Sequence, residues 1–217
     1  MESVFVVGAG ESGVGAALLA RKNKLNVFVS DYGTISEEYK KDLIDNDISF
    51  EEKGHSFEII DRSNLIVKSP GIPPGAEVLK YALSKGKKIV SEIEFAYGFN
   101  KSKIIGITGT NGKTTSSIMC HHLLRQSRLK VGLGGNVGIS FSRILASDTC
   151  YDWLVLELSS FQLEMLDTFK AEISCILNIT PDHLDRYDND FSKYASAKWN
   201  LPLHTARSGT VILNGDD

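Results

Sequence analysis

The most chemically informative stretch of the chain is residues 108–115, which read TGTNGKTT. An apolar run precedes this turn and a helix-like stretch follows it, so its glycines lie between a predicted strand and a predicted helix. Gly109 and Gly112 let the backbone curl until several N–H groups face one anion, and the helix N-terminus adds positive charge. Lys113 can reach the β- and γ-phosphates, and Thr114 can ligate the accompanying Mg²⁺. The pattern predicts a nucleoside triphosphate site formed by Gly109, Thr110, Asn111, Gly112, Lys113, Thr114 and Thr115.

This turn is a variant of the P-loop, because the full pattern has a glycine where the chain has Ile107. A glycine-rich turn between a strand and a helix can also be purely structural. The Lys-Thr-Thr sequence that follows the second glycine favours nucleotide binding over a plain turn.

Further polar residues follow other apolar runs of the second half. Glu157 ends the run 153–156, and an acid at the carboxyl end of a strand beside a phosphate turn can order Mg²⁺; the alternative is an ordinary surface strand end. Another apolar run leads into residues 178–187, where His183 stands between two aspartates. The glycine-rich residues 131–138 favour a ligand-binding loop, because such a density of glycine is costly in a regular element.

The N-terminal stretch carries a second glycine motif. An apolar run at residues 4–7 leads into Gly8, Gly10 and Gly13, and a second strand-like run ends at Asp31, about twenty residues further on. This is the dinucleotide fingerprint, and taken alone it predicts NAD binding. A helix N-terminus behind glycines also holds other diphosphates, including that of a nucleotide sugar, and a tight structural turn is a third interpretation.

These elements predict an α/β protein, with a Rossmann-like N-terminal domain followed by an incomplete P-loop-type α/β domain that binds ATP. We expect a domain boundary near residue 100, where hydrophobic periodicity gives way to a polar stretch, and hence domains 1–100 and 101–217. The proline-rich residues 69–74 follow a predicted strand and form either a structural turn or a loop that touches substrate.

Composition excludes some classes of partner. The net charge of −3 is spread without long runs, so we expect no nucleic acid partner. The sequence lacks a basic leader and an apolar stretch of membrane-spanning length, so we expect no membrane association. Cys120, Cys150 and Cys175 are far apart, as expected for free thiols in a reducing compartment, which predicts a cytoplasmic protein.

Together these stretches resemble the Mur ligase family of ATP-dependent amide-bond-forming enzymes. The resemblance rests on the phosphate turn and on three further runs: GGNVG at residues 134–138, LELSSFQLE at 156–164 and NITPDHLDRY at 178–187. The ELSSFQ run is typical of the members that add D-glutamate to UDP-N-acetylmuramoyl-L-alanine in peptidoglycan precursor synthesis. The resemblance thus implies an acid–D-amino-acid ligase that uses ATP and Mg²⁺, works through an acyl phosphate and is a monomer.

The resemblance also implies roles for particular residues. The catalytic set would be Lys113, Glu157, His183 and a carbamylated Lys198, although sequence physics alone leaves a helical lysine in solvent. Mg²⁺ would be held by Thr114, Glu157, His183 and Lys198. The UDP-linked substrate would be bound by Glu11, Ser12, Asp31, Gly71, Asn136 and Gln162. Tyr32 and Gly33 depart from the polar or basic residues that follow the matching acid in many members.

In this family a third, C-terminal domain holds the incoming amino acid, and we expect the 217-residue chain to bind substrates without turnover because it stops after a predicted strand. Two other functions stay open at this point. A nicotinamide-dependent dehydrogenase explains the N-terminal fingerprint but not Lys113, Glu157 and His183. A nucleotide-sugar-binding module without catalysis explains the first domain alone.

Overall fold

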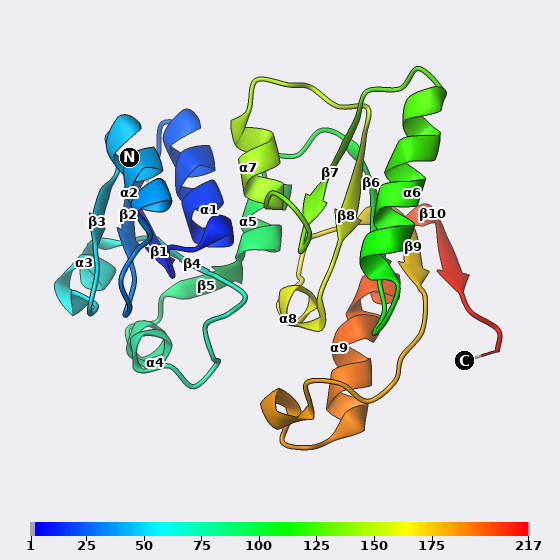
Figure 1. The fold of residues 1–217 in the computed structure, drawn as a ribbon. Coiled ribbons are helices and arrows are strands. Elements are labelled where there is room, and N and C mark those ends of the chain that lie inside the picture. The colour runs from blue at the N-terminus through cyan, green and yellow to red at the C-terminus, as the bar shows by residue number, and fades with distance from the viewer. Residues whose placement is uncertain (1–2, 217) are drawn as a thin grey trace. The chain divides into compact units, whose positions relative to one another are not determined.

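A computed structural model describes residues 3–216 (Figure 1). The chain divides into two compact units. Unit 1 comprises residues 1–99 and 140–148, and unit 2 comprises residues 100–139 and 149–217. Sequence reasoning assigned residues 140–148 to the second domain, whereas they pack within unit 1.

Unit 1 is built on a five-stranded parallel sheet with the order β3-β2-β1-β4-β5. The order reverses at β1, which pairs with both β2 and β4, and such a reversal is where open α/β sheets bind ligands. The Rossmann-like sheet predicted from sequence is therefore confirmed. Its strands are β1 (Ser3–Val7), β2 (Asn26–Ser30), β3 (Ser49–Glu51), β4 (Leu65–Lys68) and β5 (Lys88–Ser91).

Helices cover both faces of this sheet. On one face, Phe5 and Ile66 pack against Ile60 of α3 and Leu79 of α4 in a buried apolar cluster. α1 contacts β1, β2 and β4, and also packs on α2 and α5. The helices are α1 (Glu11–Lys22), α2 (Glu37–Asp45), α3 (Phe57–Arg62), α4 (Glu77–Ser84) and α5 (Glu92–Tyr97).

The last helix of unit 1, α7 (Phe141–Ala146), packs on α1 and α5. Arg143 forms ion pairs with Glu11 at 2.9 Å and with Asp42 at 2.8 Å, so its guanidinium joins α7 to α1 and α2. Glu11 also accepts a hydrogen bond from the backbone N–H of Ser140, the N-cap residue of α7. These contacts explain why a helix that lies beyond the phosphate turn in sequence belongs to the first unit.

Unit 2 contains a second five-stranded parallel sheet with the order β10-β9-β6-β8-β7. The central strand β6 pairs with β8 on one side and β9 on the other, so the three runs that carry the predicted catalytic residues end side by side. Its strands are β6 (Lys103–Thr108), β7 (Val131–Gly135), β8 (Trp153–Glu157), β9 (Ala171–Ile176) and β10 (Thr205–Leu213).

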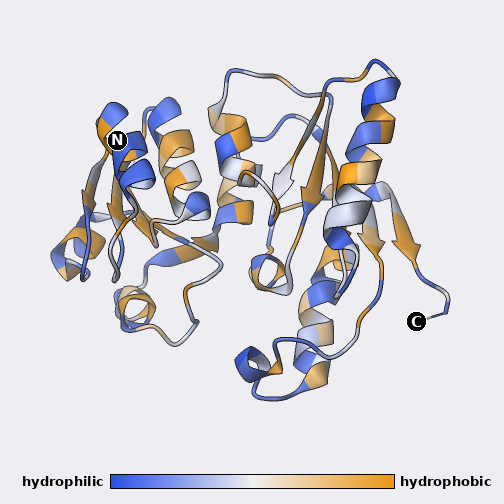
Figure 2. Ribbon diagram, in the orientation of Figure 1, coloured by the Kyte–Doolittle hydropathy of each residue, from blue (hydrophilic) through white to orange (hydrophobic). Residues whose placement is uncertain are grey.

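Helices also cover both faces of the second sheet. α6 (Lys113–Gln126) places Cys120 and Leu124 on the cluster formed by Ile105, Ile107 and Val155. α9 (Phe191–Leu203) packs on β9, β6 and β10, and α8 (Ser160–Leu163) packs on α9. The 3₁₀ helix η1 (Leu184–Tyr187) completes the unit. Figure 2 shows that the strands of both sheets are mainly apolar, as expected for parallel strands buried on both faces.

One prediction for unit 2 is wrong. The glycine-rich residues 131–138 were expected to form a loop, but Val131–Gly135 is the edge strand β7, paired in parallel with β8. At Gly132, a Cβ would lie 2.6 Å from the Leu154 side chain, so the glycine permits a close approach of neighbouring elements. Packing therefore offsets the intrinsic cost of glycine in a strand.

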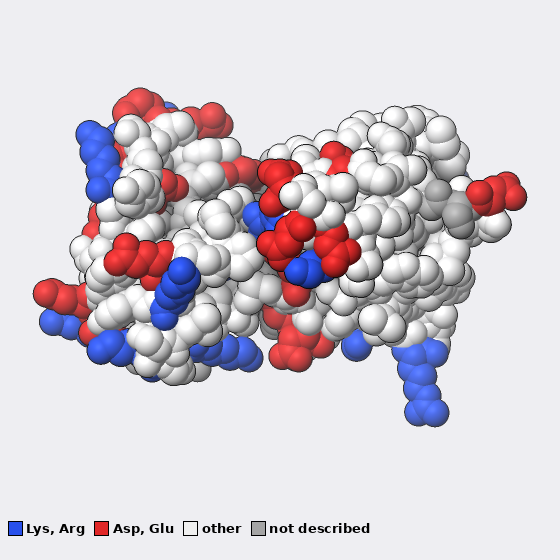
Figure 3. All heavy atoms as spheres, turned by 90° about the horizontal axis from the view of Figure 1, so that it is seen from below, with Lys and Arg blue, Asp and Glu red and all other residues white. Residues whose placement is uncertain are grey.

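Three further features concern membrane-spanning helices, surface charge and the cysteines. Among residues 3–216, we find no helix that is long and apolar enough to cross a membrane. Acidic and basic side chains are interspersed on the face shown in Figure 3. Cys120, Cys150 and Cys175 are free thiols, as predicted.

Candidate active site

The phosphate turn joins β6 to α6, as the sequence predicted. Gly112 is the N-cap residue of α6 and has a φ of 81°, a left-handed conformation that glycine adopts without strain. Its N-cap position receives no side-chain hydrogen bond, and the first-turn N–H groups of any helix lack intrahelical acceptors. The start of α6 is therefore an electropositive end suited to an anion.

Asn178, which follows β9, holds the turn in shape. Its carbonyl oxygen accepts from the backbone N–H of Thr110 at 2.9 Å, and its Oδ1 accepts from the N–H of Asn111 at 2.9 Å. The Asn178 amide in turn donates to the Asn111 carbonyl oxygen at 3.0 Å. The Thr110 hydroxyl bridges to the carbonyl oxygen of Thr180 at 3.0 Å and lies 2.9 Å from the Tyr194 hydroxyl. The turn is thus preorganised by the β9 segment and α9.

Two lysines converge on this turn. Lys113 donates to the Thr110 carbonyl oxygen at 2.8 Å, and Lys198 donates to the Gly109 carbonyl oxygen at 2.8 Å. The sequence alone predicted that Lys198, as a helical lysine, is exposed to solvent, and this prediction is wrong. Lys198 is only 2% exposed, and its ammonium lies 4.7 Å from the Tyr194 ring centroid. Burial, together with the nearby charge of Lys113, lowers the pKa of Lys198 to about 8.

Glu157 ends β8 and is 2% exposed. One carboxylate oxygen, Oε1, accepts from the Asn136 side-chain amide at 2.8 Å, whereas Oε2 is buried without a hydrogen-bond partner among the described residues. A buried carboxylate oxygen without a partner carries a desolvation cost of about 1–3 kcal/mol, so it favours a cation or donor. This orphaned oxygen fits the predicted contribution of Glu157 to a metal site.

His183 lies in the segment that follows β9, with a left-handed backbone at φ 48°. Its ring packs near Phe161, at a centroid distance of 5.3 Å, and its side chain is 57% exposed. Within the described part of the chain, no group of three or more His, Cys, Asp or Glu side chains is arranged to hold a metal. The predicted metal set draws only Glu157 and His183 from those residue types, so it stays a prediction.

Further contacts among nearby side chains stabilise the loop that carries His183. Arg186 forms a bidentate ion pair with Glu164, with Nε and Nη2 at 3.2 and 3.1 Å from the two carboxylate oxygens. The Tyr187 hydroxyl donates to the same carboxylate at 2.9 Å, and the Arg186 guanidinium lies 4.1 Å from the Phe161 ring centroid. These contacts connect η1 to the segment that follows α8.

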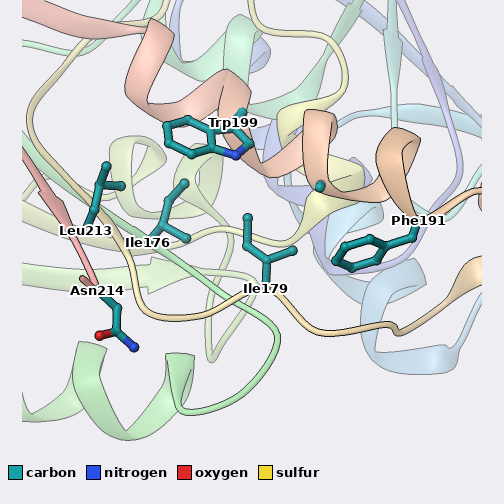
Figure 4. A pocket seen from close by; sticks show the side chains of 7 residues that line it. Ile176, Ile179, Phe191, Trp199, Leu213 and Asn214 are labelled. Atoms are coloured by element: carbon teal, nitrogen blue, oxygen red, sulfur yellow. The ribbon is translucent and has the colours of Figure 1, made fainter. Parts of the chain in front are cut away.

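Unit 2 also contains a mainly apolar pocket of 340 Å³ (Figure 4). It lies among the end of β9, the outer side of α9 and the end of β10, with Asn214 as its polar side chain. Trp199 is 43% exposed and Leu213 is 49% exposed. The lining residues are Ile176, Ile179, Phe191, Ala195, Trp199, Leu213 and Asn214.

In unit 1 the glycine motif forms the predicted turn between β1 and α1. At Gly13, a Cβ would lie 1.7 Å from the Gly8 carbonyl oxygen, so only glycine permits this approach of helix and strand. The predicted ribose ligand Asp31 accepts two backbone hydrogen bonds, from Ala9 at 2.6 Å and from Gly33 at 2.7 Å. Asp31 therefore fixes the glycine turn, and each oxygen keeps further acceptor capacity.

The other predicted substrate residues have different surroundings. Glu11 is engaged by Arg143 and Ser140, Ser12 lies next to it at the start of α1, and Gly71 lies in an exposed turn. In unit 2, Gln162 is 2% exposed and forms a capping box with Ser159 at the start of α8. Asn136 contacts Glu157, as described above. Sequence reasoning missed the structural roles of Glu11 and Gln162, although the Ser-x-x-Gln spacing is itself a capping signal.

A larger pocket, of 560 Å³, lies within unit 1. Sequence reasoning did not find it, apart from the expectation that the proline-rich turn could touch substrate. Its lining combines aromatic, aliphatic and titratable side chains from the segments that follow β2, β3 and β4 and from α3 and α4: Tyr32, His55, Phe57, Ile72, Pro73, Ala76, Glu77 and Val78.

Sequence reasoning also assigned no role to Asn178 or Tyr194. Asn178 follows β9 at the sheet edge that carries the phosphate turn, and Tyr194 lies one helical turn before Lys198. Strand order and helical spacing are the signals that could have found them.

Fold and site together define a two-unit α/β protein whose second parallel sheet carries a P-loop-type turn beside a buried lysine. The Mur ligase middle domain matches residues 107–217, and the MurD N-terminal domain matches residues 3–78. The chain belongs to the Mur ligase family.

Similar proteins from several bacteria share one name. The chain is 50% identical over 214 residues to the UDP-N-acetylmuramoylalanine--D-glutamate ligase of Porphyromonas gingivalis, covering 99% of this chain and 47% of that protein. It is 48% identical to the ligase of the same name from Cytophaga hutchinsonii, covering 100% and 48%, and 42% identical to that of Christiangramia forsetii, also covering 100% and 48%. The chain spans about half the length of these relatives.

Solved structures show the same fold. The chain matches the UDP-N-acetylmuramate:L-alanyl-gamma-D-glutamyl-meso-diaminopimelate ligase of Neisseria meningitides with a TM-score of 0.71, at 18% identity, covering 100% of this chain and 72% of that one. It matches the UDP-N-acetylmuramate-alanine ligase of Thermotoga maritima with a TM-score of 0.63, at 21% identity, covering 100% and 50%. The dehydrogenase alternative is not supported, because the N-terminal fingerprint lies within the part that matches the MurD N-terminal domain.

Proposed function

We propose that this chain carries the nucleotide-binding parts of an ATP-dependent ligase that adds D-glutamate to UDP-N-acetylmuramoyl-L-alanine. The proposal is supported by relatives of that description at 42–50% identity over almost the whole chain. The structural observation that carries it is the convergence of Lys113 and Lys198 on a preorganised phosphate turn in unit 2. Such a site suits an anionic nucleotide that must be oriented for phosphoryl transfer.

In this proposal ATP is bound by residues 109–115. The N-terminus of α6 faces the phosphates, and Lys113, which otherwise rests on the Thr110 carbonyl oxygen, moves to contact the β- and γ-phosphates. Asn178 and Tyr194 keep the turn in its curled shape, so little ordering accompanies binding.

Mg²⁺ is proposed to bind Thr114, Glu157, His183 and Lys198 in its carbamylated form. The partnerless buried oxygen of Glu157 fits a cation, and an unmodified lysine does not, because an ammonium repels one. The ammonium first loses one proton. The neutral amine then attacks CO₂, forms an N–C bond and loses a second proton, which leaves an anionic carbamate whose oxygens can ligate a cation. Bound Mg²⁺ would lower the repulsion between the triphosphate and the substrate carboxylate.

The UDP-linked substrate is proposed to bind through Glu11, Ser12, Asp31, Gly71, Asn136 and Gln162. The pocket of 560 Å³ in unit 1 supports this, because it has the size and aromatic lining of a small-molecule site. It lies where β2 and β4 end, at the sheet edge where parallel α/β sheets bind ligands.

The proposed reaction has two steps. An oxygen of the L-alanyl carboxylate attacks the γ-phosphorus of ATP, the bond to the bridging oxygen breaks, and ADP leaves. The D-glutamate amine then attacks the acyl phosphate, forms the amide bond, releases inorganic phosphate and loses a proton. Lys113 is placed to offset the negative charge that accumulates on the transferred phosphoryl group.

We also propose that the protein works in the cytoplasm, because ATP and a UDP-linked precursor are the substrates that the family resemblance implies. The same resemblance implies that the protein is a monomer. Gel filtration coupled to light scattering measures the monomer directly, and a particle of twice the chain mass would contradict it.

Isothermal titration of the 217-residue chain tests the proposal. We expect saturable binding of UDP-N-acetylmuramoyl-L-alanine, and separate Mg²⁺-dependent binding of a non-hydrolysable ATP analogue. If the chain bound the UDP-linked substrate but no nucleoside triphosphate, it would instead be a nucleotide-sugar-binding module. Binding of neither ligand by a folded chain would overturn the proposal.

A further inference from the structure

The pocket of unit 1 has an aromatic and a heteroaromatic ring side by side in its wall. Tyr32 is 79% exposed, and its ring centroid lies 6.1 Å from that of His55. Ile72 and Pro73 contribute aliphatic surface from the turn after β4. A planar ring with two apolar faces suits such walls, because aromatic side chains stack on the faces of nucleobases.

His55 is held from behind by a chain of hydrogen bonds within unit 1. Its Nδ1 lies 2.6 Å from the hydroxyl oxygen of Ser30, which is fully buried at the end of β2. The same hydroxyl oxygen lies 2.7 Å from Glu51 Oε1. Glu51 also accepts hydrogen bonds from the backbone N–H and the hydroxyl of Ser56. The imidazole is therefore oriented by fixed groups and does not rotate freely.

This chain of hydrogen bonds determines which nitrogen of His55 carries the proton. Burial opposes ionisation of Glu51, but the hydrogen bonds from Ser56 and Ser30 outweigh it and lower the pKa of that carboxyl. Ser30 has one hydroxyl proton. The Glu51 carboxylate, at 2.7 Å, is a stronger acceptor for that proton than a neutral ring or the Gly54 carbonyl oxygen at 3.2 Å. The Ser30 oxygen then accepts from Nδ1–H, which leaves Nε2 of His55 as an acceptor.

The imidazole stays neutral in this arrangement. Burial lowers the pKa of His55, although the charges of Glu51 and Asp31 oppose that change. The only other titratable side chains in the pocket lining described here are those of Tyr32 and Glu77. His55 lines the pocket, and its Nε2 is the ring nitrogen that is not engaged by Ser30.

We propose that His55 Nε2 accepts a hydrogen bond from the N3–H of a uracil base, and that this contact selects uracil over cytosine. The inference rests on the proposed function, since it assigns the base of the UDP-linked substrate to the unit 1 pocket. Uracil carries a proton on N3, whereas N3 of cytosine is itself an acceptor. Cytosine would place two lone pairs against each other and leave both groups unpaired, which is how polar sites reject close analogues.

The test is a pair of titrations with UDP and with CDP, performed on the intact 217-residue chain and on His55→Gln. We expect the chain to bind UDP at least about tenfold more tightly than CDP, equivalent to about 1.4 kcal/mol. The amide of Gln can rotate to donate or accept, so His55→Gln should bind both nucleotides with affinities within about twofold of each other. Circular dichroism establishes that the variant is folded.

Tyr32→Leu is the matched control, because Tyr32 is exposed and stacking does not distinguish the two pyrimidines. It should weaken UDP and CDP by the same factor and leave their ratio unchanged. The ¹⁵N chemical shifts of the His55 ring give a second readout, independent of affinity. Nε2 should resonate as an unprotonated nitrogen in the free chain, and its resonance should shift when UDP binds but not when CDP binds.

Three outcomes are decisive. Absence of UDP binding to the unaltered chain would overturn the proposed function itself. UDP binding with a UDP-to-CDP ratio that survives in His55→Gln would overturn only the role of His55. An Nδ1-unprotonated ring in the free chain would contradict the hydrogen-bond chain from Glu51 through Ser30.

Discussion

Lys198 and Gly109 are joined by a hydrogen bond of 2.8 Å, from the side-chain ammonium to the backbone carbonyl oxygen. This contact connects α9 directly to the phosphate turn, although the two residues are far apart in sequence. A fully buried lysine on a helix requires such a partner, since an unpaired buried ammonium is strongly unfavourable. The fold thus positions the Lys198 side chain directly against the phosphate turn.

The first prediction is that Lys198 becomes carbamylated. With Mg²⁺ and ¹³C-labelled bicarbonate present, we expect one carbamate resonance in the ¹³C spectrum of the chain. It should be absent from Lys198→Met and retained in Lys170→Met, which alters an exposed lysine of the same unit. A carbamate resonance that persists in Lys198→Met, or its absence from the unaltered chain, would contradict the proposed role.

The second prediction concerns Lys113→Ala. Its ammonium is the mobile cation of the phosphate turn, so we expect the variant to lose Mg²⁺-dependent binding of the ATP analogue. Binding of UDP should stay within about twofold, because the pocket proposed for UDP lies in unit 1. Isothermal titration measures both ligands, with Lys170→Ala as the matched control. Loss of UDP binding together with that of the ATP analogue would count against two separate nucleotide sites.

The third prediction tests the two proposed metal ligands outside the turn. Glu157→Gln and His183→Ala should each weaken Mg²⁺-dependent binding of the ATP analogue by about 1–3 kcal/mol, the cost of removing a polar partner. Glu157→Gln retains the shape of the side chain and one acceptor for Asn136. Asp185→Asn, at an exposed acid of the His183 loop, should have little effect. If the Mg²⁺ dependence survived in both variants, the ligand assignment would be wrong.

Much of the fold could be predicted because parallel strands are continuous apolar runs bounded by turns. The strands β2, β6 and β8, which end at Ser30, Thr108 and Glu157, were found in this way, together with the phosphate turn. β7 could not be predicted, because its glycines are accommodated only by packing against side chains such as Leu154. α7 was missed because its place depends on Glu11, a partner more than a hundred residues earlier.

The sequence predicted which residue types form the candidate site, but not the burial and contacts of those residues. Lys198 reads as a solvated helical lysine, and only tertiary structure brings Gly109 within reach of its ammonium. Glu11 and Gln162 read as ligands, yet both also serve structural contacts that local sequence shows only in part. Burial and long-range pairing are properties of the folded chain, so single residue patterns did not reveal them.

The last prediction concerns Glu92, at the start of α5, which is fully buried in unit 1. Its Oε1 accepts from the backbone N–H of Ser142 at 2.6 Å, and among the described residues its Oε2 has no hydrogen-bond partner. Burial raises the pKa of Glu92 to about 7, although hydrogen bonding from Ser142, whose backbone N–H donates to the carboxylate, opposes this rise. The folded state therefore binds the Glu92 proton more tightly than the unfolded state, whose ordinary value is 4.5.

The sign of the pH dependence follows from these two values. The stabilisation by the protonated group is complete below pH 4.5 and is lost as the pH rises through 7, by on the order of 3 kcal/mol. Glu92→Gln stays neutral at every pH, and its amide can still accept from Ser142. We therefore expect the variant to lose less stability than the unaltered chain between pH 5 and 8, and to be the more stable of the two at pH 8. Urea unfolding at both pH values measures this, with the exposed Glu58→Gln of unit 1 as control. Equal pH dependence in the unaltered chain and Glu92→Gln would show that Glu92 does not titrate in this range.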